Sequence, residues 1–209
     1  MEVTILGTGN MARGIATRLL AGGHEVKLLG HEAGKGEELA GELDGSVGSG
    51  VIGDPILGDV VVLAVPYEVA GPLVRKYGEE LSGKVVVDIT NPVDWQTFDG
   101  LVTPAESSAA EEIQKATHEG ARVVKAFNTT FAGTLVEGEV AGRPLDVFVA
   151  GDDPEAREMV SQLVRDGGLV AVDLGPLRRA RQLEGLGFLG MTVQQPLGLN
   201  FQSAWKLVS

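Results

Sequence analysis

The chain opens with a short apolar run, a glycine-rich turn and a helical pattern of apolar residues. Residues 2–6 form a β-branched, largely apolar run that predicts a buried strand. Residues 13–21 then place apolar side chains at helical spacing, two glycines end this pattern, and residues 25–29 predict a second strand. A strand, a glycine turn, a helix and a strand within about 30 residues are typical of a unit that binds a dinucleotide.

The residue types in the turn each have a mechanical reason to be there. Gly7 allows the tight turn, Gly9 has no Cβ to obstruct a pyrophosphate, and Ala12 is small enough for the helix to pack on the strand. The helix N-terminus offers free N–H groups to phosphate oxygens. An ordinary βα turn rich in glycine is the alternative interpretation. We predict a dinucleotide site at Gly7, Thr8, Gly9, Asn10, Met11 and Ala12.

Strand and helix patterns alternate along the rest of the chain. Further strands are predicted at 59–65, 84–89, 121–127, 145–151 and 169–174, with a short one within 44–58. Helices are predicted near 37–43 and at 68–81, 109–117 and 154–165, and a charged helical pattern begins at Arg178. This alternation predicts an α/β fold of Rossmann type, doubly wound around a mostly parallel sheet with helices on both faces.

Composition and charge narrow the choice of partners. The net charge of −12 argues against nucleic acid or an anionic membrane as a partner. The chain has no cysteine, and its three histidines (His24, His31 and His118) are scattered, so we expect no metal site. No apolar stretch reaches the length of a membrane span, and the N-terminus resembles a strand rather than a signal peptide, so we expect a cytoplasmic protein with a small-molecule partner.

The tip of the second strand carries information on the cofactor. Enzymes that use NAD usually have a carboxylate at this position for the ribose 2′-hydroxyl, whereas enzymes that use NADP have basic or small polar groups for the 2′-phosphate. Gly30 and His31 occupy the tip here, Lys35 follows, and Glu32 is the one acid nearby. We therefore predict NADP(H) as the cofactor, with Gly30, His31 and Lys35 at the 2′-phosphate. Solvated loop and surface positions are the competing interpretations of His31 and Lys35.

Three more segments follow strands at their carboxyl ends, where ligands bind in such sheets. We predict that they line the nicotinamide crevice with Val65, Pro66, Tyr67, Asn91, Pro92, Ala126 and Asn128. The long loop 90–103, which contains Trp95, follows one of these strands. Ser107-Ser108 and Thr129-Thr130 have no histidine nearby and are expected to cap helices. We assign no catalytic side chain, which fits hydride transfer between two bound groups.

Five segments together resemble the coenzyme F420-dependent NADP oxidoreductase family. They are residues 5–11, 64–67, 90–92, 124–129 and 174–181, in the order that the family has them, and Lys-Ala-Phe-Asn-Thr at 125–129 is the most specific. The resemblance implies hydride transfer between NADP(H) and the deazaflavin coenzyme F420, and a homodimer. It also implies a single domain over 1–209, in which residues 1–175 form the Rossmann part and 176–209 a small C-terminal helical extension.

The chain also departs from the family, and alternatives stay open. Gly30-His31 stand where well-known members often have Ser-Arg, and a neutral histidine binds phosphate less well than an arginine. An NADPH-dependent flavin or ferric reductase of the same fold and a non-catalytic NADP(H) sensor are the alternatives, whereas imine reductases would need a further helical domain. The tail residues Phe188, Met191, Phe201 and Trp205 could form an acceptor platform, a dimer interface or simple core, and for Arg178, Arg179 and Arg181 a solvated helix face competes with a contact to an anionic deazaflavin tail.

Overall fold

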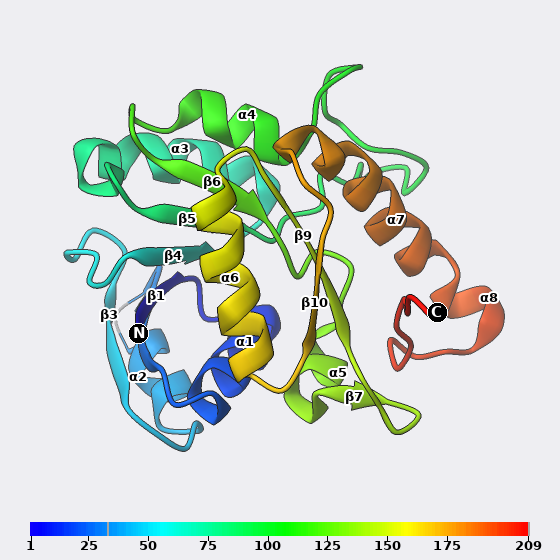
Figure 1. Cartoon of the computed structure of the whole chain (residues 1–209), viewed down its shortest axis with the longest axis horizontal. Helices are drawn as coiled ribbons and strands as arrows, with labels where there is room; N and C mark the ends of the chain where they lie inside the picture. The colour runs from blue at the N-terminus through cyan, green and yellow to red at the C-terminus, as the bar shows by residue number, and fades with distance from the viewer. Residues whose placement is uncertain (33, 209) are drawn as a thin grey trace.

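A central eight-stranded sheet organises the molecule (Figure 1). The computed structural model describes residues 1–32 and 34–208, so Ala33 of the predicted loop 30–36 and Ser209 lie outside the described residues. The strand order is β10-β9-β6-β5-β4-β1-β2-β3. The strands are β1 (Glu2–Leu6), β2 (Glu25–Gly30), β3 (Val47–Val51), β4 (Val60–Leu63), β5 (Val85–Asp88), β6 (Arg122–Lys125), β9 (Asp146–Gly151) and β10 (Val170–Asp173).

Pairing within the sheet is parallel except between β6 and β9. The chain winds from β1 outward to β3, then returns to β4 on the other side of β1. This reversal beside β1 is the topological switch point of a doubly wound sheet, where such folds bind ligands. The predicted Rossmann-type, mostly parallel architecture is confirmed.

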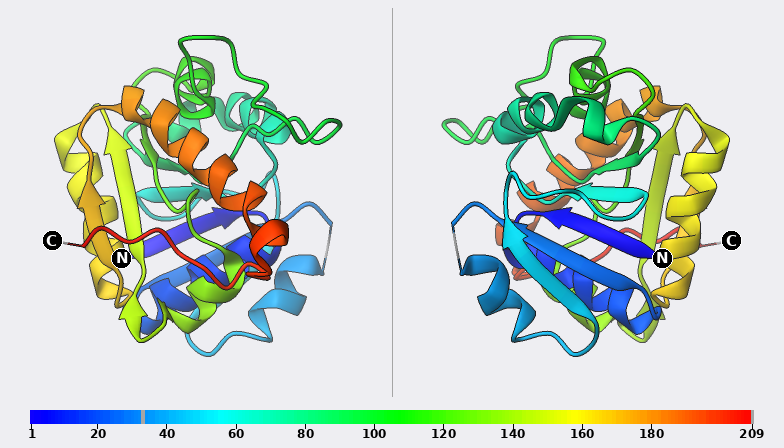
Figure 2. Two further views of the ribbon diagram at one scale, coloured as in Figure 1. Left: turned by 90° about the vertical axis from the view of Figure 1, so that its right-hand side faces the viewer. Right: turned by 90° about the vertical axis from the view of Figure 1, so that its left-hand side faces the viewer.

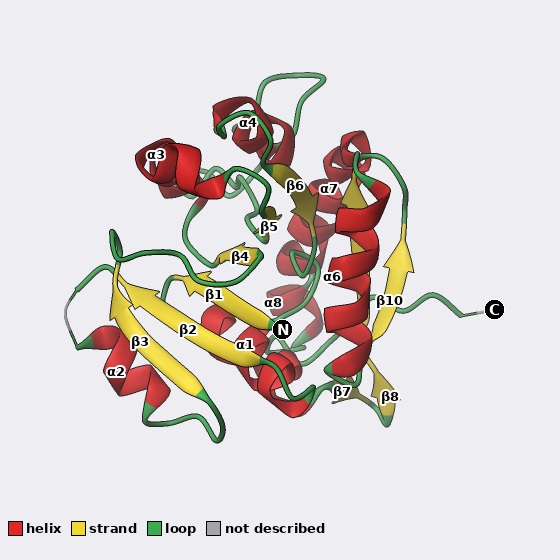
Figure 3. Ribbon diagram, turned by 60° about the vertical axis from the view of Figure 1, so that its left-hand side comes forward, coloured by secondary structure: helices red, strands yellow, loops and turns green. Residues whose placement is uncertain are grey.

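Helices cover both faces of the sheet (Figure 3). One face packs against α1 (Asn10–Ala21), α2 (Lys35–Ala40), α5 (Ala132–Glu137) and α6 (Pro154–Asp166). The other face packs against α3 (Tyr67–Tyr77) and α4 (Ala109–Ala116). Because both faces are covered, inner strands such as Val60–Leu63 and Val85–Asp88 are buried at every position. This explains why they appear in the sequence as continuous apolar runs.

Several helix boundaries differ from the expectation. Helix α1 begins at Asn10 rather than near Arg13, with Gly9 as its N-cap. The predicted helix 68–81 is divided into α3 and a 3₁₀ turn, η1 (Gly78–Leu81), because Gly78 adopts a φ of 51° that interrupts the α-helix. The short helix α5 and the hairpin of β7 (Glu139–Val140) and β8 (Arg143–Pro144) were not predicted, since elements of six and two residues are too short to show a period.

The C-terminal residues lie beside the carboxyl end of the sheet (Figure 2). A 3₁₀ turn, η2 (Leu177–Arg179), leads into α7 (Ala180–Thr192) and α8 (Gln194–Leu197). Helix α7 packs against α4. The last segment returns to the start of β9, where the Leu207 amide donates to Asp146. The predicted C-terminal helical extension is present, and its last helix ends at Leu197.

The described residues contain neither a membrane-spanning helix nor a group of side chains that could hold a metal ion. No helix there combines the length and apolar character needed to cross a membrane. Within the same residues, no three histidine or carboxylate side chains come together as a metal-binding group would require.

Candidate functional site

The two glycines of the first turn have different surroundings. Gly7 has a φ of 121°, and a Cβ there would overlap the Ala64 carbonyl oxygen and lie 2.8 Å from the Ala64 carbonyl carbon. A Cβ on Gly9 would meet no described atom within 4 Å. Gly7 is therefore required by the fold, whereas Gly9 leaves space open at the N-terminus of α1, where unpaired amides attract anions.

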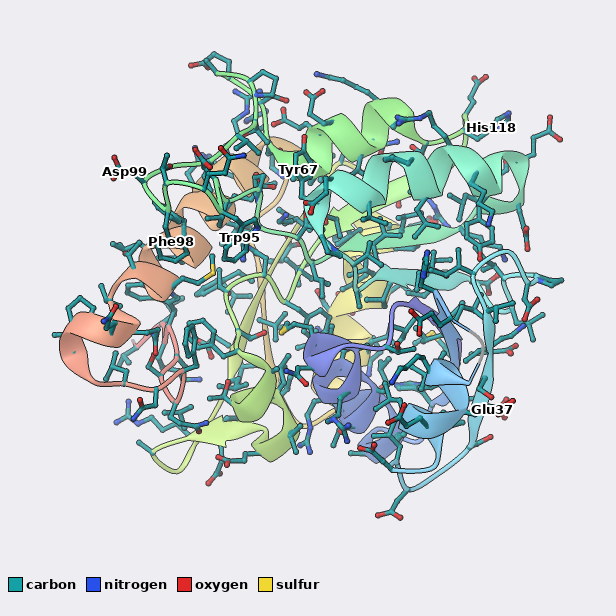
Figure 4. The ribbon with its side chains drawn as sticks, turned by 180° about the vertical axis from the view of Figure 1, so that it is seen from behind. Glu37, Tyr67, Trp95, Phe98, Asp99 and His118 are labelled. Atoms are coloured by element: carbon teal, nitrogen blue, oxygen red, sulfur yellow. The ribbon has the colours of Figure 1, made fainter. Side chains whose placement is uncertain are left out.

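A cleft of about 450 Å³ lies between this turn and the carboxyl ends of β4 and β5. Its surface is largely apolar. Its side toward α7 consists of Trp95 on the loop after β5 and Met191 on α7 (Figure 4). The lining residues are Gly9, Asn10, Met11, Ala64, Val65, Pro66, Tyr67, Glu68, Ile89, Thr90, Asn91, Trp95 and Met191.

Asn91 on the cleft surface and Asn128 beneath it connect the ends of β5 and β6 to α7. The side-chain amide of Asn91 donates to the Asn128 carbonyl oxygen at 2.8 Å, and that of Asn128 donates to Asn91 Oδ1 and to the Leu183 carbonyl oxygen, both at 2.9 Å. A Cβ on Gly187 would lie 2.6 Å from Asn91 Oδ1. The glycine thus allows α7 to press directly on the asparagine pair.

A buried ionic cluster lies next to this pair. The ammonium of Lys125 contacts Asp88 Oδ2 and Glu184 Oε1, each at 2.8 Å, and all three side chains are at most 1% exposed. Lys125 also donates to the Thr90 carbonyl oxygen. The other contacts of Glu184 are the amides of Ala109 and Ala110 at the start of α4. The cluster therefore joins two sheet strands to α4 and α7.

Burial and charge act in opposite directions within this cluster. Burial by itself would lower the pKa of Lys125, but the carboxylates of Asp88 and Glu184 outweigh it and raise that pKa above the ordinary lysine value. Burial raises the pKa of Glu184, against the opposing influence of Lys125 and the Ala109 amide. Because every hydrogen-bond partner of Glu184 is a donor, we treat the neutral-pH cluster as an ammonium between two carboxylates.

Two polar side chains on the cleft surface, Tyr67 and Thr90, are available to a ligand. Burial raises the pKa of Tyr67, with Glu112 adding to the effect, so the phenol keeps its proton at neutral pH. Thr90 is 4% exposed, and its hydroxyl has no hydrogen-bond partner within residues 1–32 and 34–208. Thr90 therefore offers the cleft a polar group that a ligand amide or carbonyl could satisfy.

The predicted 2′-phosphate residues lie apart from this cleft, at the end of β2. His31 is exposed, and the Lys35 ammonium pairs with Glu38 Oε2 at 2.8 Å. A Cβ on Gly30 would lie 3.2 Å from the Gly36 amide nitrogen, so α2 packs closely against this tip. Lys35 is therefore partly neutralised by its own helix.

The structure separates the predicted site residues into three groups. Gly9, Asn10, Met11, Val65, Pro66, Tyr67 and Asn91 line the cleft. The residues behind it are Gly7 and Ala12 in the turn and core, Pro92 and Ala126 in the interior, and Asn128 beneath Asn91. Gly30 ends β2, His31 follows it, and Lys35 begins α2. Thr8, within the glycine turn, belongs to none of these three groups.

Helix capping and the tail were predicted only in part. Ser108 caps α4 by accepting from the Glu111 amide. Thr130 does not cap α5, because its hydroxyl donates to the Phe127 carbonyl oxygen. Arg181 binds Glu111 instead of remaining a solvated charge. Of the tail residues, Met191 lines the cleft, whereas Trp205 packs against Gly190 on another side of α7.

Sequence reasoning missed the ionic cluster and the lining residues Ala64, Glu68 and Ile89 as site residues. Lys125 inside the apolar run 121–127 and Asp88 inside the predicted strand 84–89 were available signals, since a charge in a buried strand requires a partner. The sequence does not show which acids supply that partner.

The fold and the cleft define a Rossmann-class protein whose switch-point site is suited to a dinucleotide and a second planar group. Residues 2–92 match the family model described as "NADP oxidoreductase coenzyme F420-dependent". The chain is 32% identical to the F420-dependent NADP reductase of Methanocaldococcus jannaschii, with 89% of each chain covered. This protein belongs to the F420-dependent NADP oxidoreductase family.

Two further comparisons place the chain among its relatives. A crystal structure from Arthrobacter sp. FB24, provisionally named an F420-dependent NADP-reductase, superposes with a TM-score of 0.86 at 28% identity and 99% coverage of both chains. The metalloreductase STEAP3 of Rattus norvegicus is 30% identical over 88% of this chain, which spans 36% of that protein.

Proposed function

We propose that this protein transfers a hydride between NADP(H) and the deazaflavin coenzyme F420. The observation that carries the proposal is a single cleft with two kinds of surface. One side is the glycine turn and the N-terminus of α1, and the other is apolar and aromatic. Two planar groups could thus be held against one another, which is the geometry that hydride transfer requires.

Each side of the cleft has a binding role in this proposal. Gly9 and the first amides of α1 would hold the pyrophosphate, and Thr90 and Asn91 would hold the nicotinamide end. NADPH, when bound, supplies the hydride. The proposal assigns no acid or base role to a side chain, because the hydride passes directly between the two rings and the Lys125 ammonium is enclosed by Asp88 and Glu184. The protein's part is to orient two rings and exclude water.

The test is a comparison of hydride acceptors. NADPH oxidation is followed with F420, FMN, FAD and a ferric chelate side by side, and NADPH binding is measured separately by calorimetry. We expect F420 to be reduced with the highest kcat/KM, in metal-free buffer. Binding of NADPH without reduction of any of the four acceptors would favour a sensor module instead.

A flavin or ferric reductase is the second candidate, because STEAP3 is named a metalloreductase and matches most of this chain. Faster reduction of FMN or the ferric chelate than of F420 would support this candidate over the first.

We also propose that two copies associate through the C-terminal residues. Large apolar side chains are exposed there, namely Leu189, Leu197, Phe201, Leu207 and Val208. Large exposed apolar side chains gathered in one region often mark interfaces between proteins. Light scattering coupled to size exclusion should give the mass of a dimer, and Leu197→Glu with Phe201→Glu should give that of a monomer.

A further inference from the structure

The loop after β5 forms an ordered projection beside the cleft. Its ends are paired through the bridge between Val93 and Leu101, and the Asp94 amide donates to the Gly100 carbonyl oxygen at 2.9 Å. The Asp94 carboxylate accepts from the amides of Gln96 and Thr97 and from the Thr97 hydroxyl. These bonds define the turn that carries Trp95 and Phe98.

Three aromatic rings from this loop and α7 stand in series. The ring centroids of Trp95 and Phe98 are 5.8 Å apart, and those of Phe98 and Phe188 are also 5.8 Å apart at an interplanar angle of 65°. Figure 4 shows Trp95 and Phe98 between α7 and Tyr67, with Asp99 at the outer edge of the loop. We call Trp95, Phe98 and Phe188 the aromatic wall.

The aromatic wall has features of a binding surface. Trp95 lines the cleft, yet 64% of its surface is exposed, and Phe98 is 41% exposed. Phe98 also has a φ of 52°, a backbone conformation that costs energy for a bulky residue and that often occurs at ligand clamps. Large aromatic faces left open beside a cleft are suited to stacking against a planar ring.

The charge around the aromatic wall disfavours binding of the anionic tail of a deazaflavin along this loop. Residues 85–114 contain no lysine or arginine. Asp88, Glu111 and Glu112 are paired with Lys125, Arg181 and Lys115 from outside this range, so the acids that loop 90–103 itself adds to the rim are Asp94 and Asp99. Glu68 adds a carboxylate to the cleft lining itself. The Thr97 hydroxyl and the loop amides lower the pKa of Asp94, so this carboxylate is ionised at neutral pH. An anionic tail would be repelled along this loop.

We propose that Trp95, Phe98 and Phe188 bind the tricyclic ring of the hydride acceptor, and that this wall recognises the ring and not its anionic tail. The proposal rests on the proposed function, and it assigns the acceptor side of the cleft to side chains of loop 90–103 and α7. Stacking supplies the affinity, and the acidic rim directs the tail away from the loop.

Tryptophan fluorescence gives a test that does not depend on turnover. The chain has two tryptophans, so Trp205→Phe leaves Trp95 as the single reporter and Trp95→Phe leaves Trp205. Oxidised F420 is added to each protein in the presence of NADP⁺, so that no hydride is available. We expect saturable quenching that is several-fold stronger in Trp205→Phe than in Trp95→Phe, because Trp95 would touch the ring, whereas Trp205 lies against Gly190 outside the cleft and is reached only by energy transfer. Equal quenching in the two proteins would count against contact between Trp95 and the ring. Quenching confined to Trp205, or in neither protein, overturns the proposal.

Steady-state kinetics provide the second measurement. We expect Trp95→Ala to raise the KM for F420 about tenfold, with a smaller change in kcat, and Trp95→Phe to restore most of the loss because it keeps an aromatic face. Trp205→Phe is the matched control and should keep the wild-type KM, since Trp205 packs against Gly190 outside the cleft. An unchanged KM in Trp95→Ala would remove Trp95 from the acceptor site.

A deazaflavin that lacks the phosphate and glutamates of the F420 tail tests whether the wall recognises the ring and not the tail. We expect its KM to lie within about threefold of that of F420, because stacking on the wall dominates. A KM for F420 at least tenfold lower would mean that the tail is recognised. If the wild-type protein reduces no acceptor, the proposed function fails, while quenching of Trp95 by F420 or the tail-less ring still decides whether the wall binds a ring.

Discussion

The two sides of the cleft are built in different ways. The glycine side, residues 7–12, is backbone from one turn, and its properties follow from the missing Cβ of Gly9 and the N-terminus of α1. The aromatic side is made of side chains from loop 90–103 and α7, which are distant in sequence. The first side is a local property of the chain, whereas the second exists only after α7 has docked.

Helix α7 is held against the sheet by buried polar contacts, which are unusual in the interior of a protein. Lys125, Glu184 and the Asn91–Asn128 pair connect this helix to β5 and β6. Buried ion pairs contribute little net stability when complete, but leaving one partner unpaired is costly. The cluster therefore supports one specific placement of α7, and with it the position of Phe188 and Met191.

The largest effect is expected at Gly7, on the glycine side. Gly7→Val should prevent folding, because its Cβ would overlap the Ala64 carbonyl and its φ of 121° is unfavourable for a β-branched residue. Circular dichroism and a thermal melt should show no cooperative transition. Recovery of a soluble protein with the wild-type melting temperature would contradict the assignment of Gly7 to the fold.

The next effect concerns the aromatic side through Lys125. Lys125→Met should destabilise the protein by about 3–5 kcal/mol, because it leaves Asp88 and Glu184 buried without a counter-charge. Urea unfolding measures the difference. Lys115→Met is the matched control, since Lys115 is an exposed partner of Glu112 and its loss should cost about 0–1 kcal/mol.

The pH dependence of the Lys125 contribution has a defined sign. Its pKa is raised in the folded state, so the stability from its charge is complete below the ordinary lysine pKa and is lost as pH rises through the raised value. Lys125→Met should lack this alkaline loss. A variant and wild type whose unfolding free energies differ by the same amount at all pH values would show that the charge is not responsible.

The sequence predicted the glycine side because its signal is contained in about 30 residues, and it predicted β4 and β5 because strands covered on both faces are continuously apolar. It did not predict the ionic cluster. Asp88, Lys125 and Glu184 lie on three elements, and no local period relates them. Trp95 was visible only as part of a long loop, since its pairing with Phe98 and Phe188 is a tertiary contact.

A smaller effect, on binding alone, is expected at Gly9. Gly9→Val should leave the melting temperature nearly unchanged, because no described atom lies within 4 Å of its Cβ. It should weaken NADPH binding by about 100-fold, or roughly 2.7 kcal/mol, by filling the approach to the α1 amides. Calorimetry tests this against Gly185→Val, a control with equally open surroundings on α7. Equal NADPH affinity in the two variants would remove Gly9 from the cofactor site.

The smallest effect is expected at the tip of β2, where His31 is exposed and Lys35 is paired with Glu38. If this tip holds the 2′-phosphate, His31→Arg should strengthen NADPH binding by about 1–2 kcal/mol through a charged hydrogen bond. NADH affinity should not change, because NADH has no 2′-phosphate. Glu38→Gln should give a smaller gain in the same direction, since it releases the Lys35 ammonium from an exposed pair. Parallel titrations with NADPH and NADH measure both variants. Equal gains for the two cofactors would mean that the added charge attracts the pyrophosphate at long range, and the 2′-phosphate would then have to be bound by other residues.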